Sequence, residues 1–178
     1  MILPVDDWIL LEAAQDGDVD AFEALVRRHQ AAVYRVALRM LGSEADAQDA
    51  TQETFVRAWR GLRRFRGESA VRTWLYRIVT RRCLDVIAAR RPTEDLREAK
   101  LQTGADPAEI AEQRERLRAV TRIIAGLPGE QRAALVLREF EGLSYDQVAA
   151  VLNTSVPAVK GRIHRARLAV LKQTAPWR

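Results

Sequence analysis

The chain has 178 residues, of which 48% are hydrophobic and 30% are charged, with a formal net charge of +5. This composition is ordinary for a globular protein, and the length suits one large domain or two small ones. No apolar run approaches the roughly 20 residues needed to span a bilayer, and the N-terminus lacks a secretory pattern. We therefore expect a cytoplasmic protein without membrane insertion.

Cysteine and histidine usage argues against a metal site or a disulfide. The chain has one cysteine, Cys83, and two histidines, His29 and His164, so neither an internal disulfide nor a zinc spacing is available. Paired acids and bases, nucleophile motifs and glycine-rich phosphate loops are also missing from the sequence. We expect no metal, no cofactor, no small-molecule substrate and no enzymatic activity, and we interpret Cys83 as a small buried helix residue.

Positive charge is concentrated in two blocks. Residues 57–91 hold eleven basic residues against two acidic ones, and residues 155–178 hold six against none, whereas residues 1–56 and 92–154 are net acidic. The local field, rather than the net charge, attracts phosphates, so the pattern indicates two nucleic-acid contacts. A solvated arginine-rich surface is the alternative for either block, because 26 of the 29 basic residues are arginine.

Hydrophobic residues recur at threes and fours along the chain, and no alternating valine and isoleucine run favours a strand. The sequence therefore predicts an all-α fold. The basic loop Leu62–Glu68 interrupts the helical pattern. The expected helices are one around Ile9–Ala14, a second capped by Asp18 or Asp20 and ended by Gly42, a third from Ser43 to Gly61, a fourth capped by Ser69 and reaching about Ala89, a pattern resuming at Ala108, and a helix after Pro128 that stops before Gly142.

The stretch from Pro92 to Pro107 has the composition of a linker. It contains Pro92, Pro107, Gly104, scattered charges and few large apolar residues. We expect two small helical domains, residues 1–91 and residues 108–178, joined by a flexible linker at 92–107. The two domains are expected to fold separately and to reach separate targets.

Residues 144–172 have the pattern of a helix-turn-helix. Ser144 and Gln147 fit a capping box, Asn153 breaks the first helix, and Ser155 is positioned to cap the second. At about 100° per residue, the second helix turns an apolar stripe inward and a cationic face outward, which suits a DNA major groove. The candidate duplex-binding residues are Ser155, Lys160, Arg162, His164, Arg165 and Arg167.

A stripe of acidic and amide side chains lies on the third expected helix. Spacings of three and four residues place Asp46, Asp49, Gln52 and Glu53 on one face. Such a stripe suits docking against a basic helical partner. A solvated acidic face is the alternative.

Residues 62–82 supply the side chains that hold unpaired bases, namely aromatic surfaces and cations. Phe65 lies in a loop of arginines, whereas Trp74 borders an apolar face and suits a core position as well as a stacking platform. The candidate single-strand-binding residues are Arg63, Phe65, Arg66, Trp74, Tyr76, Arg77 and Arg81.

Two long runs of the sequence carry a family resemblance: residues 46–92 (DAQDATQETFVRAWRGLRRFRGESAVRTWLYRIVTRRCLDVIAARRP) and residues 127–167 (LPGEQRAALVLREFEGLSYDQVAAVLNTSVPAVKGRIHRAR). In this order, the two runs resemble a bacterial extracytoplasmic-function sigma factor of the sigma-70 family. The resemblance covers nearly the whole chain. It implies an RNA polymerase specificity subunit whose first domain binds core polymerase and melts the −10 element, and whose second domain reads the −35 element.

The resemblance also assigns roles to the candidate residues. It implies that the acidic stripe meets the polymerase clamp coiled coil, that the Phe65 loop captures a flipped −10 base, and that an anti-sigma factor is a partner. Arg165 is best placed for a bidentate contact to a guanine edge, with Lys160, Arg162 and Arg167 on phosphates. The chain departs from the common pattern at Pro157, often glycine, and at Gly161, often a hydroxyl residue, which leaves the promoter sequence open.

Two alternatives remain from the sequence. A free-standing helix-turn-helix regulator usually dimerises on two half-sites, and residues 1–61 offer no obvious symmetric seam. A sigma-like decoy that sequesters an anti-sigma factor need not keep two strongly basic blocks.

Overall fold

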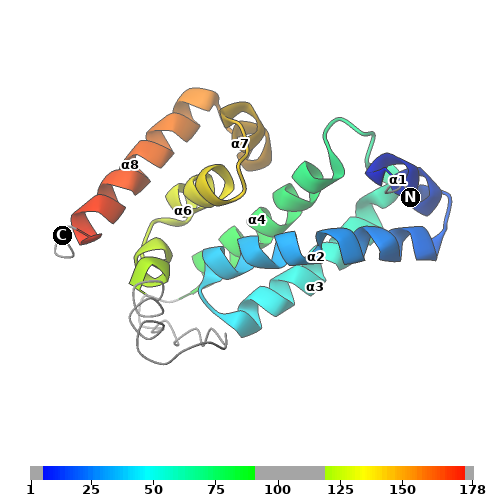
Figure 1. Cartoon of the computed structure of the whole chain (residues 1–178), viewed down its shortest axis with the longest axis horizontal. Coiled ribbons are helices and arrows are strands. Elements are labelled where there is room, and N and C mark those ends of the chain that lie inside the picture. Colours follow the sequence, from blue (N-terminus) through cyan, green and yellow to red (C-terminus); the bar gives the residue numbers. More distant parts are fainter. Residues whose placement is uncertain (1–5, 91–118, 175–178) are drawn as a thin grey trace, which may run out of the picture.

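The computed structural model describes residues 6–90 and 119–174, and within these ranges the chain is helical with no strand. Figure 1 shows α1 to α4 packed as one group and α6 to α8 as a second, with α6 between α8 and α4. The linker predicted at residues 92–107 lies outside the described residues, as does the start of the helical pattern expected from Ala108. The elements are α1 (Asp7–Gln15), α2 (Val19–Leu41), α3 (Glu44–Gly61), the 3-10 turn η1 (Leu62–Arg64), α4 (Val71–Ala89), α6 (Gly129–Leu135), the π-helical turn η2 (Val136–Phe140), α7 (Tyr145–Leu152) and α8 (Val156–Thr174). Residues 119–125 are helical as well.

Most helix starts follow the predicted caps. The Asp18 carboxylate accepts a hydrogen bond from the Ala21 amide at 3.1 Å, and the Ser43 hydroxyl accepts one from the Asp46 amide at 3.3 Å. These side chains satisfy amides that lack a partner within the first helical turn. The expected cap of α4 is wrong: α4 begins after Ala70 without a side-chain cap, and the Ser69 hydroxyl donates to the Ala70 carbonyl at 3.4 Å.

The first domain buries an apolar core between α2, α3 and α4. Met40, Tyr76 and Val79 are completely buried there. Cys83 is buried on α4, as predicted, and its burial raises the pKa of the thiol to about 12. The thiol therefore remains protonated and unreactive at neutral pH.

The second domain contains the predicted helix-turn-helix. The capping box of α7 is present, with the Gln147 amide 3.1 Å from the Ser144 hydroxyl and the Ser144 amide 2.8 Å from the Gln147 side-chain oxygen. Asn153 ends α7 in the left-handed region, with φ at 48°. Val159 and Ile163 of α8 are buried, so the apolar stripe of α8 faces inward as its periodicity predicts.

The two groups of helices are in contact, mainly where α4 meets α6 and α7. Gly129, at the start of α6, faces Leu84: a Cβ added at Gly129 would lie 3.1 Å from a Leu84 methyl group. The buried Arg132 side chain of α6 donates to the Met40 carbonyl at the end of α2 and to the Ala125 carbonyl. Burial lowers the pKa of Arg132 to about 10, so it remains charged at neutral pH. Tight packing and a buried charge thus join the two domains.

In the described ranges, none of the helices combines the length and the apolar character that crossing a membrane requires.

Candidate nucleic-acid interface

The outward face of α8 carries exposed cationic and aromatic side chains. Lys160, His164 and Arg165 are exposed. The Arg165 guanidinium lies along Gly161, where an added Cβ would sit 3.4 Å from it, so the absence of a side chain at Gly161 gives Arg165 room. Ser155, a predicted DNA contact, also has a structural role, because its hydroxyl accepts a hydrogen bond from the Ala158 amide at 3.3 Å.

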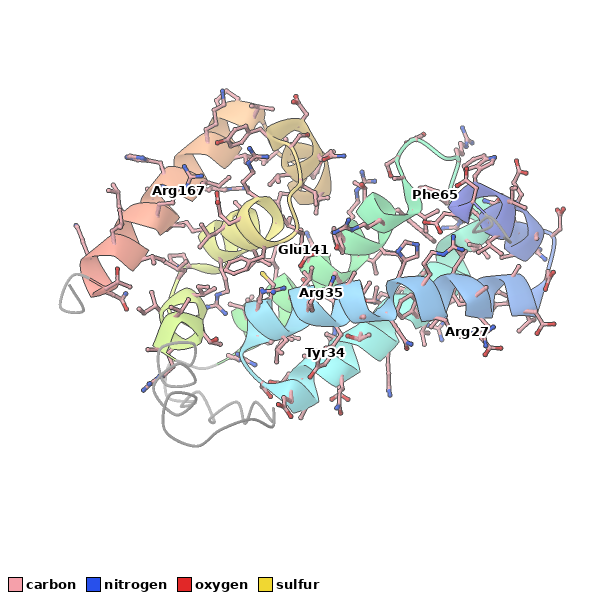
Figure 2. All side chains as sticks on the ribbon, viewed as in Figure 1. Arg27, Tyr34, Arg35, Phe65, Glu141 and Arg167 are labelled. Carbon is pink, nitrogen blue, oxygen red and sulfur yellow. The ribbon has the colours of Figure 1, made fainter. Side chains whose placement is uncertain are left out.

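The two arginines that flank this face are paired with acidic residues of their own domain. Arg162 lies 2.9 Å from Glu130, with 22% of its side chain exposed, and Arg167 lies 2.6 Å from Glu139, with 52% exposed. Figure 2 shows the position of Arg167 on α8. Because exposed pairs contribute only about 0–1 kcal/mol, a DNA phosphate competes readily for Arg167. The less exposed Arg162 is the weaker candidate.

Lys160 is held by an aromatic ring. Its ammonium group lies 5.5 Å from the centre of the Tyr145 ring, and the Arg138 guanidinium lies 4.7 Å from the same ring. These distances permit cation–π attraction. Tyr145, the first residue of α7, therefore helps to orient a candidate phosphate contact on α8.

The second basic surface is the loop between α3 and α4. The rings of Phe65 and Trp74 stack, with centroids 4.6 Å apart and an interplanar angle of 22°. Both residues are half-buried. Trp74 is therefore both a core residue and the support on which Phe65 rests, and the pair presents an aromatic surface of the kind that stacks with unpaired bases.

Two residues of the first helix fix the conformation of this loop, and sequence reasoning missed both. The Gln15 side-chain amide donates to the Leu62 carbonyl at 2.9 Å and to the Phe65 carbonyl at 2.8 Å. The Trp8 ring covers Gly67, where φ is 72° and an added Cβ would lie 2.3 Å from ring atoms. Figure 2 shows Phe65 beside α1. No local signal reveals these contacts, because the partners lie about 50 residues away in the sequence.

The remaining candidates for single-strand binding divide into two groups. Arg63, Arg66, Arg77 and Arg81 are exposed, and Arg81 makes a loose pair with Asp85 at 3.4 Å. Tyr76 is completely buried, and its hydroxyl donates to Glu141 at 2.5 Å. Burial, together with the bond to Glu141, raises the pKa of Tyr76 to about 12. Tyr76 does not reach solvent in this arrangement of the domains.

The acidic stripe of α3 is only partly free. Asp46 pairs with Arg90 at 2.6 Å and Glu53 with Arg57 at 2.8 Å. Its other two members, Asp49 and Gln52, are exposed, as are the apolar residues Val56 and Trp59 farther along α3. The Trp59 ring packs against Phe22, with centroids 4.8 Å apart, while 42% of the residue remains exposed.

Among the described residues, no group of three or more histidine, cysteine, aspartate or glutamate side chains is arranged to hold a metal ion. The candidate interface consists of arginine, lysine, histidine and aromatic side chains. This chemistry binds phosphates and bases.

Comparisons with known proteins agree with this geometry. Residues 25–93 match the family described as Sigma-70 region 2, and residues 117–170 match that described as Sigma-70, region 4. The chain is 38% identical over 188 residues to the RNA polymerase sigma-H factor of Pseudomonas aeruginosa, across 99% of this chain and 97% of that protein. It is also 38% identical over 182 residues to the ECF RNA polymerase sigma-E factor of Salmonella typhimurium, across 96% and 95%. A solved structure of CnrH in complex with the cytosolic domain of CnrY is similar, with a TM-score of 0.74, 32% identity, and coverage of 96% and 97%.

Proposed function

The chain belongs to the sigma-70 family, in its extracytoplasmic-function group, and on that premise we propose a division of labour between its two domains. It is a sigma factor that binds core RNA polymerase and directs initiation at specific promoters. We place its action in the cytoplasm and assign it no chemistry of its own. The chemistry of transcription belongs to the polymerase.

The helix-turn-helix is the proposed −35 reader. The observation that carries this role is the exposed face of α8, where Arg165 has free access to solvent beside Gly161. An arginine on a recognition helix is suited to a bidentate contact with a guanine edge. Lys160 and Arg167 are proposed to hold phosphates on either side.

The loop between α3 and α4 is the proposed −10 reader. Phe65 is held on Trp74 and lies among exposed arginines, so a flipped base meets an aromatic ring within a cationic field. Because Gln15 and Trp8 fix the loop before DNA arrives, less conformational freedom is lost when the base binds.

The exposed part of α3 is the proposed contact with core polymerase. Asp49 and Gln52 supply polar groups, while Val56 and Trp59 supply apolar area on the same helix. An anti-sigma factor is a further proposed partner. This proposal follows from membership of the family, and CnrH, which is 32% identical to the chain, was solved in complex with the cytosolic domain of CnrY.

Transcription from genomic DNA by core polymerase with the purified chain tests the function as a whole. We expect new transcripts whose start sites share −35 and −10 sequences. Core polymerase without the chain is the control. Absence of new transcripts with several compatible core enzymes would favour the regulator or decoy alternatives.

The division of labour is tested by Arg165→Ala and Phe65→Ala. Arg165→Ala should weaken −35 duplex binding by about 1–3 kcal/mol and relax specificity at one position, while strands still open once polymerase is loaded. Phe65→Ala should leave duplex affinity near normal and reduce open complexes, because a lost stacking contact costs about 1–3 kcal/mol.

A −35 duplex binding assay and permanganate footprinting separate the two effects. Lys172→Ala, an exposed substitution on the last turn of α8, is the control for the first variant. Phe65→Tyr, which keeps an aromatic ring, is the control for the second. If both alanine variants lose duplex binding equally and open DNA equally well, the proposed division is wrong.

A further inference from the structure

A single carboxylate, that of Glu141, connects the second domain to the first. One of its oxygens accepts hydrogen bonds from the Tyr76 hydroxyl at 2.5 Å and from an Arg72 nitrogen at 3.2 Å. The other oxygen accepts a hydrogen bond from an Arg39 nitrogen at 3.1 Å. Arg72 also donates to the Glu141 backbone carbonyl at 3.4 Å. Figure 2 shows Glu141 where the second domain meets the first.

The cluster is a built site on the first domain. Only 2% of the Glu141 side chain is exposed, and a buried carboxylate is unfavourable unless it is paired and hydrogen-bonded. Arg39 on α2, together with Arg72 and Tyr76 on α4, meets that requirement. Two guanidinium groups and a phenol hydroxyl all donate to this carboxylate, and donors of these types are also suited to a phosphate oxygen.

Around Glu141 the contact between the domains is polar, whereas elsewhere Gly129 packs closely against Leu84. Arg39 and Arg72 keep 32% and 48% of their side chains exposed while they bind Glu141. Interfaces between domains that move relative to each other are more polar than permanent ones. Separation of the domains would leave three donors facing solvent without an anion.

We propose that Arg39, Arg72 and Tyr76 form a binding site for a backbone phosphate of nucleic acid, and that Glu141 occupies this site in the chain alone. The inference rests on the proposed function, because a nucleic-acid ligand is what the first domain is proposed to hold. Residues 57–91, which include α4, hold eleven basic residues against two acidic ones, so the local field favours a polyanion.

By helical periodicity, Arg72 and Tyr76 lie on one flank of α4, and Trp74 lies on the opposite flank. The site is therefore separate from the Phe65 loop. It would hold the backbone of the bound nucleic acid rather than an unpaired base. Glu141 thereby acts as an internal competitor of nucleic acid.

Glu141→Gln tests the proposal in the full chain, because it keeps the side-chain shape and removes the charge. We expect a larger radius of gyration in small-angle X-ray scattering. We also expect oligothymidylate to bind roughly tenfold more tightly at low salt, since at least one charge-assisted hydrogen bond that opposes binding is weakened. Glu23→Gln is the matched control: it makes the same change at an exposed carboxylate that pairs with Arg27 inside the first domain.

A second substitution identifies the ligand site. Arg72→Ala in the Glu141→Gln background should reverse the gain in oligothymidylate affinity, whereas Arg27→Ala, at an exposed arginine paired with Glu23, should not. If Glu141→Gln does not fold, Tyr76→Phe removes one hydroxyl from the cluster and should also enlarge the chain.

Three results would overturn the proposal. The first is a Glu141→Gln chain with the size and affinity of the Glu23→Gln control. The second is a larger chain whose oligothymidylate affinity is unchanged, and the third is preferential capture of polyglutamate, which would assign the site to an acidic peptide. None of these assays uses polymerase, so their failure is distinguishable from failure of the transcription test.

Discussion

Gln15→Leu isolates the contribution of the first helix to promoter opening. Leucine has a similar size but cannot donate, so the hydrogen bonds to the Leu62 and Phe65 carbonyls, at 2.9 and 2.8 Å, are lost together. Each neutral hydrogen bond contributes about 0.5–1.5 kcal/mol net, which gives a total of about 1–3 kcal/mol for holding the loop. Since about 1.4 kcal/mol is a factor of ten, open complexes should fall by about tenfold.

The assay combines permanganate footprinting with measurements that a purely structural defect would also change. Affinity for a −35 duplex and for core polymerase should stay at the wild-type level, while permanganate reactivity falls. Gln30→Leu, the same substitution at an exposed position of α2, is the matched control. Wild-type strand opening by Gln15→Leu, or an equal loss of duplex binding and opening, would refute the positioning role.

Two further predictions concern α3 and α4. Reversal of Asp49 and Glu53 to lysine should weaken co-elution with core polymerase and preserve helical content by circular dichroism. The same charge reversal at exposed Asp20 and Glu23 should leave co-elution with core polymerase unchanged. Equal co-elution of both double variants would remove α3 from the docking surface. Cys83 should resist alkylation in the native chain, because its thiol is buried. Folding raises the pKa of this thiol from near 9 to about 12, so between these pH values the folded state binds more protons than the unfolded state. The free energy of unfolding should therefore fall as the pH rises through this window. Cys83→Ala should flatten this part of the pH profile measured by chemical denaturation, and rapid native alkylation would contradict the burial argument.

Local features of the fold were predictable from the sequence because their causes are local. A cap such as Ser43 or Ser144 satisfies amides within three residues of itself, so the pattern of types and spacings contains the whole interaction. The apolar stripe of α8 follows from helical periodicity in the same way. Ser69 is the exception: the helix starts one residue later than expected, and the hydroxyl turns to a neighbouring carbonyl.

Contacts between distant segments were not predictable, because no spacing in the sequence encodes them. Gln15 and Glu141 are ordinary polar residues in the sequence, and their roles appear only when the fold places them against carbonyls or donors from another segment. The pairing of Arg162 with Glu130 likewise turns an expected phosphate contact into an intradomain ion pair. Charge alone therefore indicates basic segments, but it does not indicate which of their cations are paired within the chain.

The Glu141 cluster has a thermodynamic consequence for how the two targets of a sigma factor influence each other. If the first domain binds nucleic acid only after the second domain leaves Arg72 and Tyr76, only molecules with separated domains can bind. The apparent affinity of the chain alone for nucleic acid is then reduced in proportion to the fraction of such molecules. A polymerase that holds the domains apart removes this reduction and so strengthens DNA binding without touching the DNA. By linkage, DNA then strengthens polymerase binding by the same factor. The buried carboxylate thus favours promoter binding by the assembled complex over binding by the free subunit.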